Sequence, residues 1–253
     1  MKSALLLILI LLLSSTATAE DSPCRLKVGW EEWFPLIHQH DGQLTGSEYQ
    51  LLLQLANGAG CSLEFIEVPW ARALQLLKRG QLDMLYGASR TAEREAYAQF
   101  SQTYRLEQMV LVVRVPEGSQ QQDTGELSLV AWLAEHRPGG QPHMLGLIRG
   151  FYYGDALEPI VRDPATREQR LEVRWDQQLH QMLILGRIDG YLVEASVARA
   201  QQAVGGQPMR VFNVSEHPEE PMHLMFSREV PRAVVERFDN AIRLQREAPA
   251  VLH

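Results

Sequence analysis

The sequence predicts an α/β protein with two lobes, and three observations support this prediction. Apolar runs of strand length alternate along the chain with amphipathic segments of helical spacing. One unit occurs twice: a helical segment ends at a glycine, and one residue later an aliphatic residue and an aspartate lead into an apolar strand. The copies are Gly80-Gln81-Leu82-Asp83 and Gly186-Arg187-Ile188-Asp189, and we expect both aspartates to bind turn N–H groups. The length of 253 residues suits one large or two small domains.

The first 19 residues have the pattern of a cleaved signal peptide. A basic residue precedes the apolar run from Ala4 to Leu13, and Thr16 to Ala19 ends in an A-x-A cleavage site. The run is too short to span a bilayer comfortably, although an uncleaved anchor is the alternative. The residues before Cys24 do not match a lipoprotein signal. We therefore expect a periplasmic protein that begins near Glu20 and is not a lipoprotein.

Cys24 and Cys61 are predicted to form one disulfide. Two cysteines in an exported chain suggest such a bond. Each cysteine stands two residues before a predicted strand, Leu26 to Gly29 and Leu63 to Val68. If these strands are parallel neighbours, both sulfur atoms lie at the same end of the sheet. Two independent buried thiols are the alternative.

The segment between these strands contains a predicted helix, Gly46 to Ala56, and a histidine pair. His38-Gln39-His40-Asp41 has no third ligand cluster to complete a metal site, so we interpret it as a solvated loop with a turn at Asp41-Gly42. We expect neither a metal nor a cofactor. The net charge of −7 argues against nucleic acid and against anionic membrane surfaces.

The next stretch, residues 69–104, predicts a ligand site. Trp70 to Arg79 has the spacing of an amphipathic helix, and Leu82 to Tyr86 is a short strand. Ligands of α/β sheets bind just past the carboxyl ends of strands. That position holds the hydroxyl group of Ser89 and the guanidinium group of Arg94, whose planar fork suits a carboxylate.

This stretch carries the pattern aromatic-x-x-x-L, L-x-x-G-x-L-D, S-x-T-x-E-R and F-S-x-x-Y. The pattern resembles the family 3 periplasmic solute-binding proteins, the polar amino-acid binders, and the likeness extends over nearly the whole mature chain. The resemblance implies a two-lobed clamshell with two crossing hinge strands. Lobe 1 would contain residues 20–109 and 219–253, and lobe 2 residues 110–218.

The remaining elements follow from the apolar pattern and the resemblance. Met109 to Val113 is expected to be the first crossing strand, after which residues 116–128 form a polar surface excursion. Asp176 is expected to be the N-cap of a helix. The other predicted strands are 144–148, 171–175, 209–214 and 222–226, and the other predicted helices are 129–135, 177–185 and a last one that starts at Pro231.

The resemblance also implies roles for three residues at the cleft. Trp33 aligns with an aromatic residue that stacks on the ligand, and Trp70 with one that closes over it. Glu194 stands where the amino-acid binders have an aspartate for the ligand's ammonium group. Core packing of the tryptophans, and a surface glutamate that opens the next helix, are the alternatives. Gly46-Ser47-Glu48 departs from the family's usual G-F-D, which weakens any assignment there.

Residues 149–154 resemble the family's second-lobe turn, and we expect them to open a helix that runs through Ile160. The N–H groups of that helix terminus would face the ligand. The family's small hydroxyl residue is replaced here by Phe151, which leaves the ligand class open. Tyr152 or Tyr153 would partly fill the pocket instead, and we include Tyr152 among the ligand-binding residues.

The function that we predict is capture of a small polar solute, foremost an amino acid or a related zwitterion or carboxylate, for ABC-type uptake by a monomeric protein. Its partner would be an ABC permease or a membrane sensor. Two alternatives stay open: a periplasmic sensory or partner-presenting module, and a cyclohexadienyl-dehydratase-like enzyme on the same fold with Glu194 as general acid. Because no nucleophile–base pair stands out, we expect no catalytic residues and no enzyme.

Overall fold

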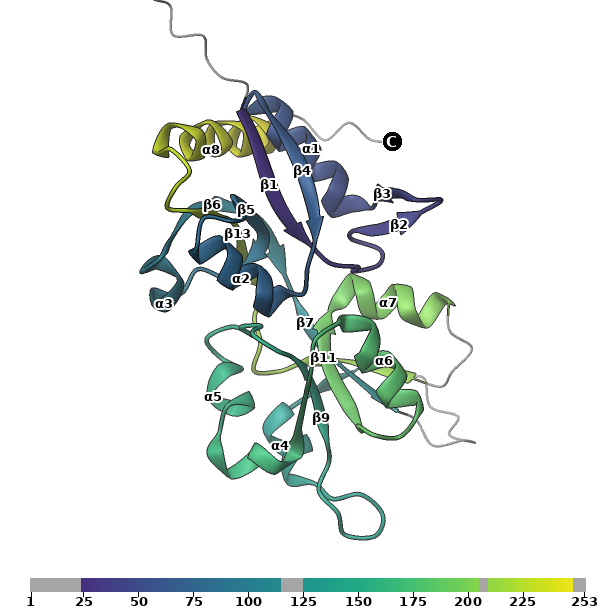
Figure 1. Ribbon diagram of the computed structural model, residues 1–253. Coiled ribbons are helices and arrows are strands. Elements are labelled where there is room, and N and C mark those ends of the chain that lie inside the picture. Colours follow the sequence, from purple (N-terminus) through teal and green to yellow (C-terminus); the bar gives the residue numbers. More distant parts are fainter. Residues whose placement is uncertain (1–23, 115–124, 205–208, 248–253) are drawn as a thin grey trace, which may run out of the picture.

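The computed structural model describes residues 24–114, 125–204 and 209–247, which form two lobes (Figure 1). Lobe 1 contains a five-stranded sheet in the order β4-β1-β5-β13-β6. The first three of these strands are parallel, and β13 runs antiparallel to both of its neighbours. The strands are β1 (Cys24–Trp30), β4 (Cys61–Glu67), β5 (Met84–Ala88), β6 (Ala98–Glu107) and β13 (Glu220–Ser227).

Lobe 2 contains a six-stranded sheet in the order β10-β9-β11-β7-β12-β8. Its strands are β7 (Met109–Arg114), β8 (Glu126–Leu127), β9 (Leu145–Ile148), β10 (Arg170–Val173), β11 (Gly190–Glu194) and β12 (Met209–Val214). The chain passes into lobe 2 at Gln108, between β6 and β7, and returns between β12 and β13. The predicted fold, a two-lobed clamshell with two crossings, is confirmed. The residue boundaries of the lobes stay a prediction.

Helices cover both faces of each sheet, as their apolar stripes require. In lobe 1, one core lies under α1 and α8 and a second under α2. The helices of lobe 1 are α1 (Ser47–Gly58), α2 (Trp70–Lys78), α3 (Ala92–Glu95) and α8 (Arg232–Glu247). Those of lobe 2 are α4 (Leu129–Ala134), α5 (Glu158–Val161), α6 (Asp176–Ile184), α7 (Ala195–Val204) and the 3₁₀ helix η1 (Pro164–Gln169). No helix in the described residues is long and apolar enough to cross a membrane.

The repeated glycine–aspartate unit has the same construction in both lobes. The carboxylate of Asp83 accepts a hydrogen bond from the backbone N–H of Lys27 at 2.7 Å, and that of Asp189 accepts one from Met144 at 2.7 Å. The N–H group of each aspartate donates back to the same residue's carbonyl oxygen, at 2.9 and 2.8 Å. Both aspartates are therefore structural. They bind an adjacent chain segment rather than their own turn.

Three local predictions were wrong. The solvated loop at His38 is an antiparallel hairpin of β2 (His38–His40) and β3 (Gln43–Thr45), whose turn places Asp41 and Gly42 at positive φ. Residues 149–154 do not open a helix, because α5 begins only at Glu158. Asp176 is the first residue of α6 rather than its N-cap. The predicted signal peptide and most of the excursion at 116–128 lie outside the described residues.

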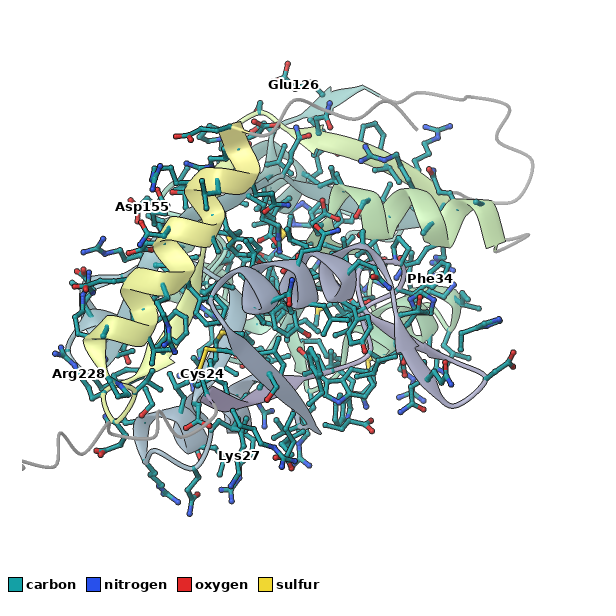
Figure 2. All side chains as sticks on the ribbon, turned by 90° about the horizontal axis from the view of Figure 1, so that it is seen from above. Cys24, Lys27, Phe34, Glu126, Asp155 and Arg228 are labelled. Atoms are coloured by element: carbon teal, nitrogen blue, oxygen red, sulfur yellow. A yellow bond between two sulfur atoms is a disulfide. The ribbon has the colours of Figure 1, made fainter. Side chains whose placement is uncertain are left out.

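Cys24 and Cys61 form the predicted disulfide (Figure 2). They lie directly opposite each other in the parallel pairing of β1 with β4, with their Cα atoms 4.5 Å apart. Both cysteines stand at the amino ends of these strands. The bond therefore joins the ends that point away from lobe 2.

We predict that reducing this disulfide lowers the free energy of unfolding by at most about 4 kcal/mol, because the bond closes a loop of moderate length in the unfolded chain. The sequence separation of the two cysteines is 37 residues. Guanidinium unfolding with and without a reductant measures the effect. Superimposable unfolding curves would contradict it. The affinity for a ligand at the opposite strand ends should be unchanged.

Candidate functional site

A pocket lies between the lobes, where the carboxyl ends of β1, β4 and β5 face the loop that follows β9 (Figure 1). Parallel strands bring their carboxyl ends to one edge of a sheet, so segments that are distant in sequence meet there. The residues that line the pocket are Gly29, Trp30, Glu31, Trp33, Val68, Trp70, Ala73, Tyr86, Gly87, Ser89, Arg94, Glu107, Met109, Phe151 and Tyr152.

Arg94 is the cation of this pocket and is 93% buried, since only 7% of its surface is exposed. It lies on α3, whose N-cap is the hydroxyl group of Thr91. Its guanidinium group donates to the carbonyl oxygens of Ser89 at 3.0 Å and Gly150 at 3.3 Å. Burial lowers its pKa. No carboxylate of the described residues forms an ion pair with it, and its direct polar partners there are backbone carbonyl groups.

The carbonyl oxygen of Gly150 connects the two lobes. It accepts a second hydrogen bond from the indole N–H of Trp70 at 3.0 Å, and the guanidinium carbon of Arg94 lies 5.6 Å from the centre of that indole ring. Gly150 has φ of +81°, and a Cβ atom there would lie 3.2 Å from Cβ of Ala71. A glycine is needed at this position because the backbones of the two lobes approach closely.

Phe151 packs against both tryptophans that were predicted to bind the ligand. Its ring packs edge-on against Trp33, with centroids 6.4 Å apart, and against Trp70 at 5.6 Å. The space left in the pocket is about 40 Å³, which holds only a few water molecules. A solute therefore requires that the lobes separate or that Phe151 turns away.

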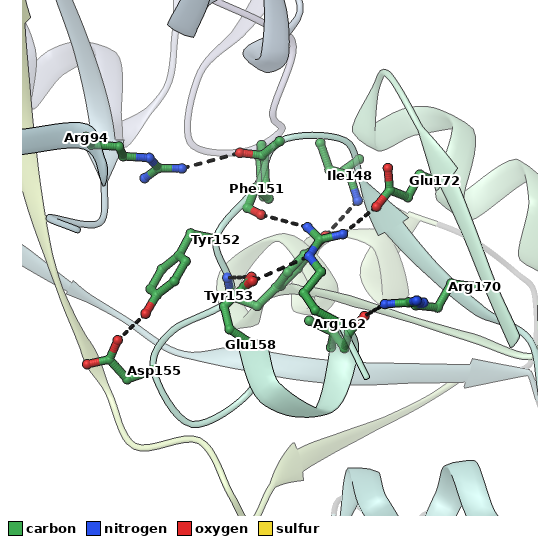
Figure 3. Close-up of polar contacts among 12 residues, drawn as sticks. Arg94, Ile148, Phe151, Tyr152, Tyr153, Asp155, Glu158, Arg162, Arg170 and Glu172 are labelled. Carbon is green, nitrogen blue, oxygen red and sulfur yellow. Dashed lines mark hydrogen bonds and ion pairs between the residues drawn. The ribbon is translucent and has the colours of Figure 1, made fainter. Parts of the chain in front are cut away.

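The loop that carries Phe151 is held by a polar network (Figure 3). Arg162 donates to the carbonyl oxygen of Phe151 at 3.1 Å, and its guanidinium group pairs with the carboxylates of Glu158 and Glu172. The N–H group of Tyr153 donates to Glu158 at 2.9 Å. Contacts on three sides thus fix the loop without a helix.

Two glutamates, Glu31 and Glu107, supply the carboxyl groups of the site. Glu31 receives one long hydrogen bond, from the N–H group of Trp70 at 3.4 Å, and burial raises its pKa to about 8. Glu107 pairs with Arg105 at 3.0 Å, yet burial still raises the pKa of Glu107. The pocket therefore has one cation, Arg94 on α3, and two acidic residues, Glu31 directly after β1 and Glu107 at the end of β6.

The family model for bacterial extracellular solute-binding proteins, family 3, matches residues 26–243. The chain belongs to this family. The resemblance in residues 69–104 is thereby confirmed, and the pocket between the lobes is the expected place for a solute. No curated protein sequence matches the chain significantly.

Solved structures with the same fold are amino-acid-binding proteins of low sequence identity. One is holo ArgBP from T. maritima, with a TM-score of 0.71 and 17% identity over 89% of this chain and 92% of that one. Another is AbpA, an amino acid ABC transporter substrate-binding protein from Streptococcus pneumoniae bound to L-arginine, with a TM-score of 0.70 and 19% identity over 88% and 89%. An ancestral arginine-binding protein bound to glutamine has a TM-score of 0.71 and 20% identity over 88% and 92%.

Five of the six predicted ligand-binding residues line this family's inter-lobe pocket: Trp33, Trp70, Ser89, Arg94 and Tyr152. Glu194 does not. One of its carboxylate oxygens accepts hydrogen bonds from the N–H groups of Ser196 at 2.7 Å and Val197 at 3.2 Å. Glu194 thus caps the start of α7 from a half-buried position. Its role as a ligand-binding residue stays a prediction.

The sequence interpretation missed Glu31, Glu107 and Met109. Glu31 was detectable, because it directly follows the first predicted strand, where ligands of α/β sheets bind. Glu107 gave no signal, since its burial and its ion pair with Arg105 depend on tertiary packing. Met109 was predicted only as part of a crossing strand. It reaches the pocket because it is the first residue of β7, where the chain passes between the lobes.

We predict that Glu31→Gln stabilises the ligand-free protein more at pH 9 than at pH 5. The pKa of Glu31 is raised on folding from 4.5 to about 8, so the folded state favours the protonated carboxyl group and loses stability as the pH rises toward 8. The cost is about 1.4 kcal/mol per pKa unit before solvent screening, or a few kcal/mol at most. Thermal melts of both proteins at both pH values measure it.

The exposed Glu67 provides the matched control. Glu67→Gln should change the melting temperature equally at pH 5 and pH 9. If Glu31→Gln also changed the melting temperature equally at both pH values, the raised pKa of Glu31 would be contradicted.

Proposed function

We propose that the protein captures a small zwitterion, foremost an α-amino acid, between its lobes and delivers it for ABC-type uptake from the periplasm. The observation that carries this proposal is the buried, unpaired Arg94. A guanidinium group taken out of water and left without a counter-charge favours an anionic partner, and its fork suits a carboxylate. Arg94 also lines the pocket.

The acidic groups supply the other half of this proposal. Glu31 and Glu107 line the same pocket as Arg94 and are candidates to bind the ammonium group of the ligand. An α-amino acid carries both charges at short separation. The aromatic rings of Trp33 and Trp70 would cover its apolar atoms. Structures of this fold bound to arginine or glutamine support this ligand class.

We further propose that the protein binds its solute without changing it and acts as a monomer. Glu194, the general acid of the enzymatic alternative, is engaged as a helix cap. Among the described residues the pocket contains no histidine, cysteine or lysine that would act as a base or nucleophile. The amino acid recovered after incubation with the protein should have an unchanged mass.

We predict that Arg94→Ala abolishes ligand binding and leaves the fold intact. A thermal-shift screen of the twenty amino acids identifies the ligand, because a ligand at one hundred times its Kd adds about 2.7 kcal/mol to stability. Calorimetry should then show a loss of about 2–5 kcal/mol of binding free energy in the variant, since one partner of a desolvated charge pair is removed.

Arg90→Ala is the matched control. Arg90 lies in the same segment, its side chain is 54% exposed, and it pairs with Glu95 at the surface. This variant should bind like the wild type. An unchanged Kd in Arg94→Ala would contradict the proposal that Arg94 binds the carboxylate of the ligand.

A further inference from the structure

A second cavity lies beside the main pocket, between the loop after β1 and the helices α6 and α7. Its volume is about 290 Å³, roughly twice that of an engineered protein cavity that binds benzene. Both lobes contribute to its wall. The residues that line it are Glu32, Phe34, Asp176, Gln177, His180, Gln181 and Gln201.

Asp176 is the unusual residue of this cavity. Only 8% of its surface is exposed, and the one hydrogen bond that its carboxylate receives from the described residues is a long one of 3.5 Å from the side-chain amide of Gln201. An acidic residue in the first turn of a helix interacts favourably with the helix dipole. An exposed carboxylate would do so without the desolvation cost of burial. A buried carboxylate is costly unless a partner compensates it. Burial is the only cause that raises the pKa of Asp176, to about 7.

The surroundings of Asp176 are acidic. Glu32 lines the same cavity, and the charge of Asp176 raises the pKa of Glu31, which faces the main pocket. No lysine or arginine is among the described residues that line the cavity. The charge of Asp176 thus opposes the ionisation of Glu31 across this boundary, and a cation bound beside Asp176 would offset that effect.

The other side chains of the cavity suit an organic cation. Gln177, Gln181 and Gln201 present amide groups that accept hydrogen bonds from N–H donors. His180, one helical turn after Asp176, has a pKa lowered by burial and so adds no positive charge. Phe34, labelled in Figure 2, adds an aromatic ring that is 42% exposed and can cover the methylene groups of a ligand.

We propose that this cavity is a second binding site, which binds the ammonium or guanidinium group of a small organic cation with Asp176 as its carboxylate. A metal ion is the poorer match, because no group of three metal-ligating side chains exists in the described residues. The site goes beyond the proposed function, since it uses neither Arg94 nor a ligand carboxylate. Because residues of both lobes form it, binding there favours the closed arrangement.

The test is calorimetric titration of the mature chain with agmatine, which carries an ammonium and a guanidinium group and no carboxylate. At pH 8.5 the carboxyl group of Asp176 is ionised. We expect agmatine to bind the wild type and to bind Asp176→Asn at least tenfold more weakly. Asparagine preserves the size of the side chain and is favoured at helix starts. A melting curve at or above that of the wild type would show that the variant is folded.

Asp163→Asn is the charge-matched control. Asp163 lies in the same lobe, is exposed and caps η1, so agmatine should bind this variant within twofold of the wild type. Equal Kd values in the wild type and Asp176→Asn, or no binding to the wild type, would overturn the proposal. Neither outcome affects the amino-acid assignment, which is tested separately by Arg94→Ala.

Discussion

The guanidinium group of Arg105 connects the parts of this protein that must move together. It pairs with Glu48 of α1 at 2.9 Å and with Glu107 at 3.0 Å, immediately before the chain crosses to lobe 2. Its guanidinium carbon also lies 5.9 Å from the centre of the Trp33 ring. Removing one member of such a buried pair costs about 3–5 kcal/mol, because the other charge stays uncompensated. The guanidinium group of Arg105 therefore joins α1, the end of β6 and the pocket residue Trp33.

The two lobes are built in the same way but contribute different groups to the pocket. Each has a glycine-stopped helix and an aspartate that ties the following strand to its parallel neighbour, as Asp83 and Asp189 show. Lobe 1 contributes three strand ends and Arg94 to the pocket. Lobe 2 contributes Met109 of β7 and one loop, whose carbonyl at Gly150 and ring at Phe151 contact lobe 1 directly. The lobes are therefore alike in framework and different in chemistry.

The framework was predictable from sequence because it depends on local signals. Apolar periodicity, stop glycines and matched cysteine offsets gave the strands, the main helices and the disulfide. The loop after β9 was not predictable, since a tertiary network around Arg162 fixes it in place of a helix. The cap that Glu194 provides for α7 was foreseen only as an alternative, and its predicted role toward a ligand stays a prediction. The burial of Glu31 and Asp176 depends on how the lobes meet, which no local pattern encodes.

The central claim is that a solute enters between separated lobes and is enclosed when they close. The inter-lobe contacts of Gly150 and Phe151 leave too little space for a solute while the lobes stay together and Phe151 keeps its place. A ligand shifts the balance only by binding the closed form better. Small-angle X-ray scattering of the protein, alone and saturated with its most stabilising amino acid, tests this directly. The account predicts a smaller radius of gyration with ligand. Identical radii in both states would contradict it.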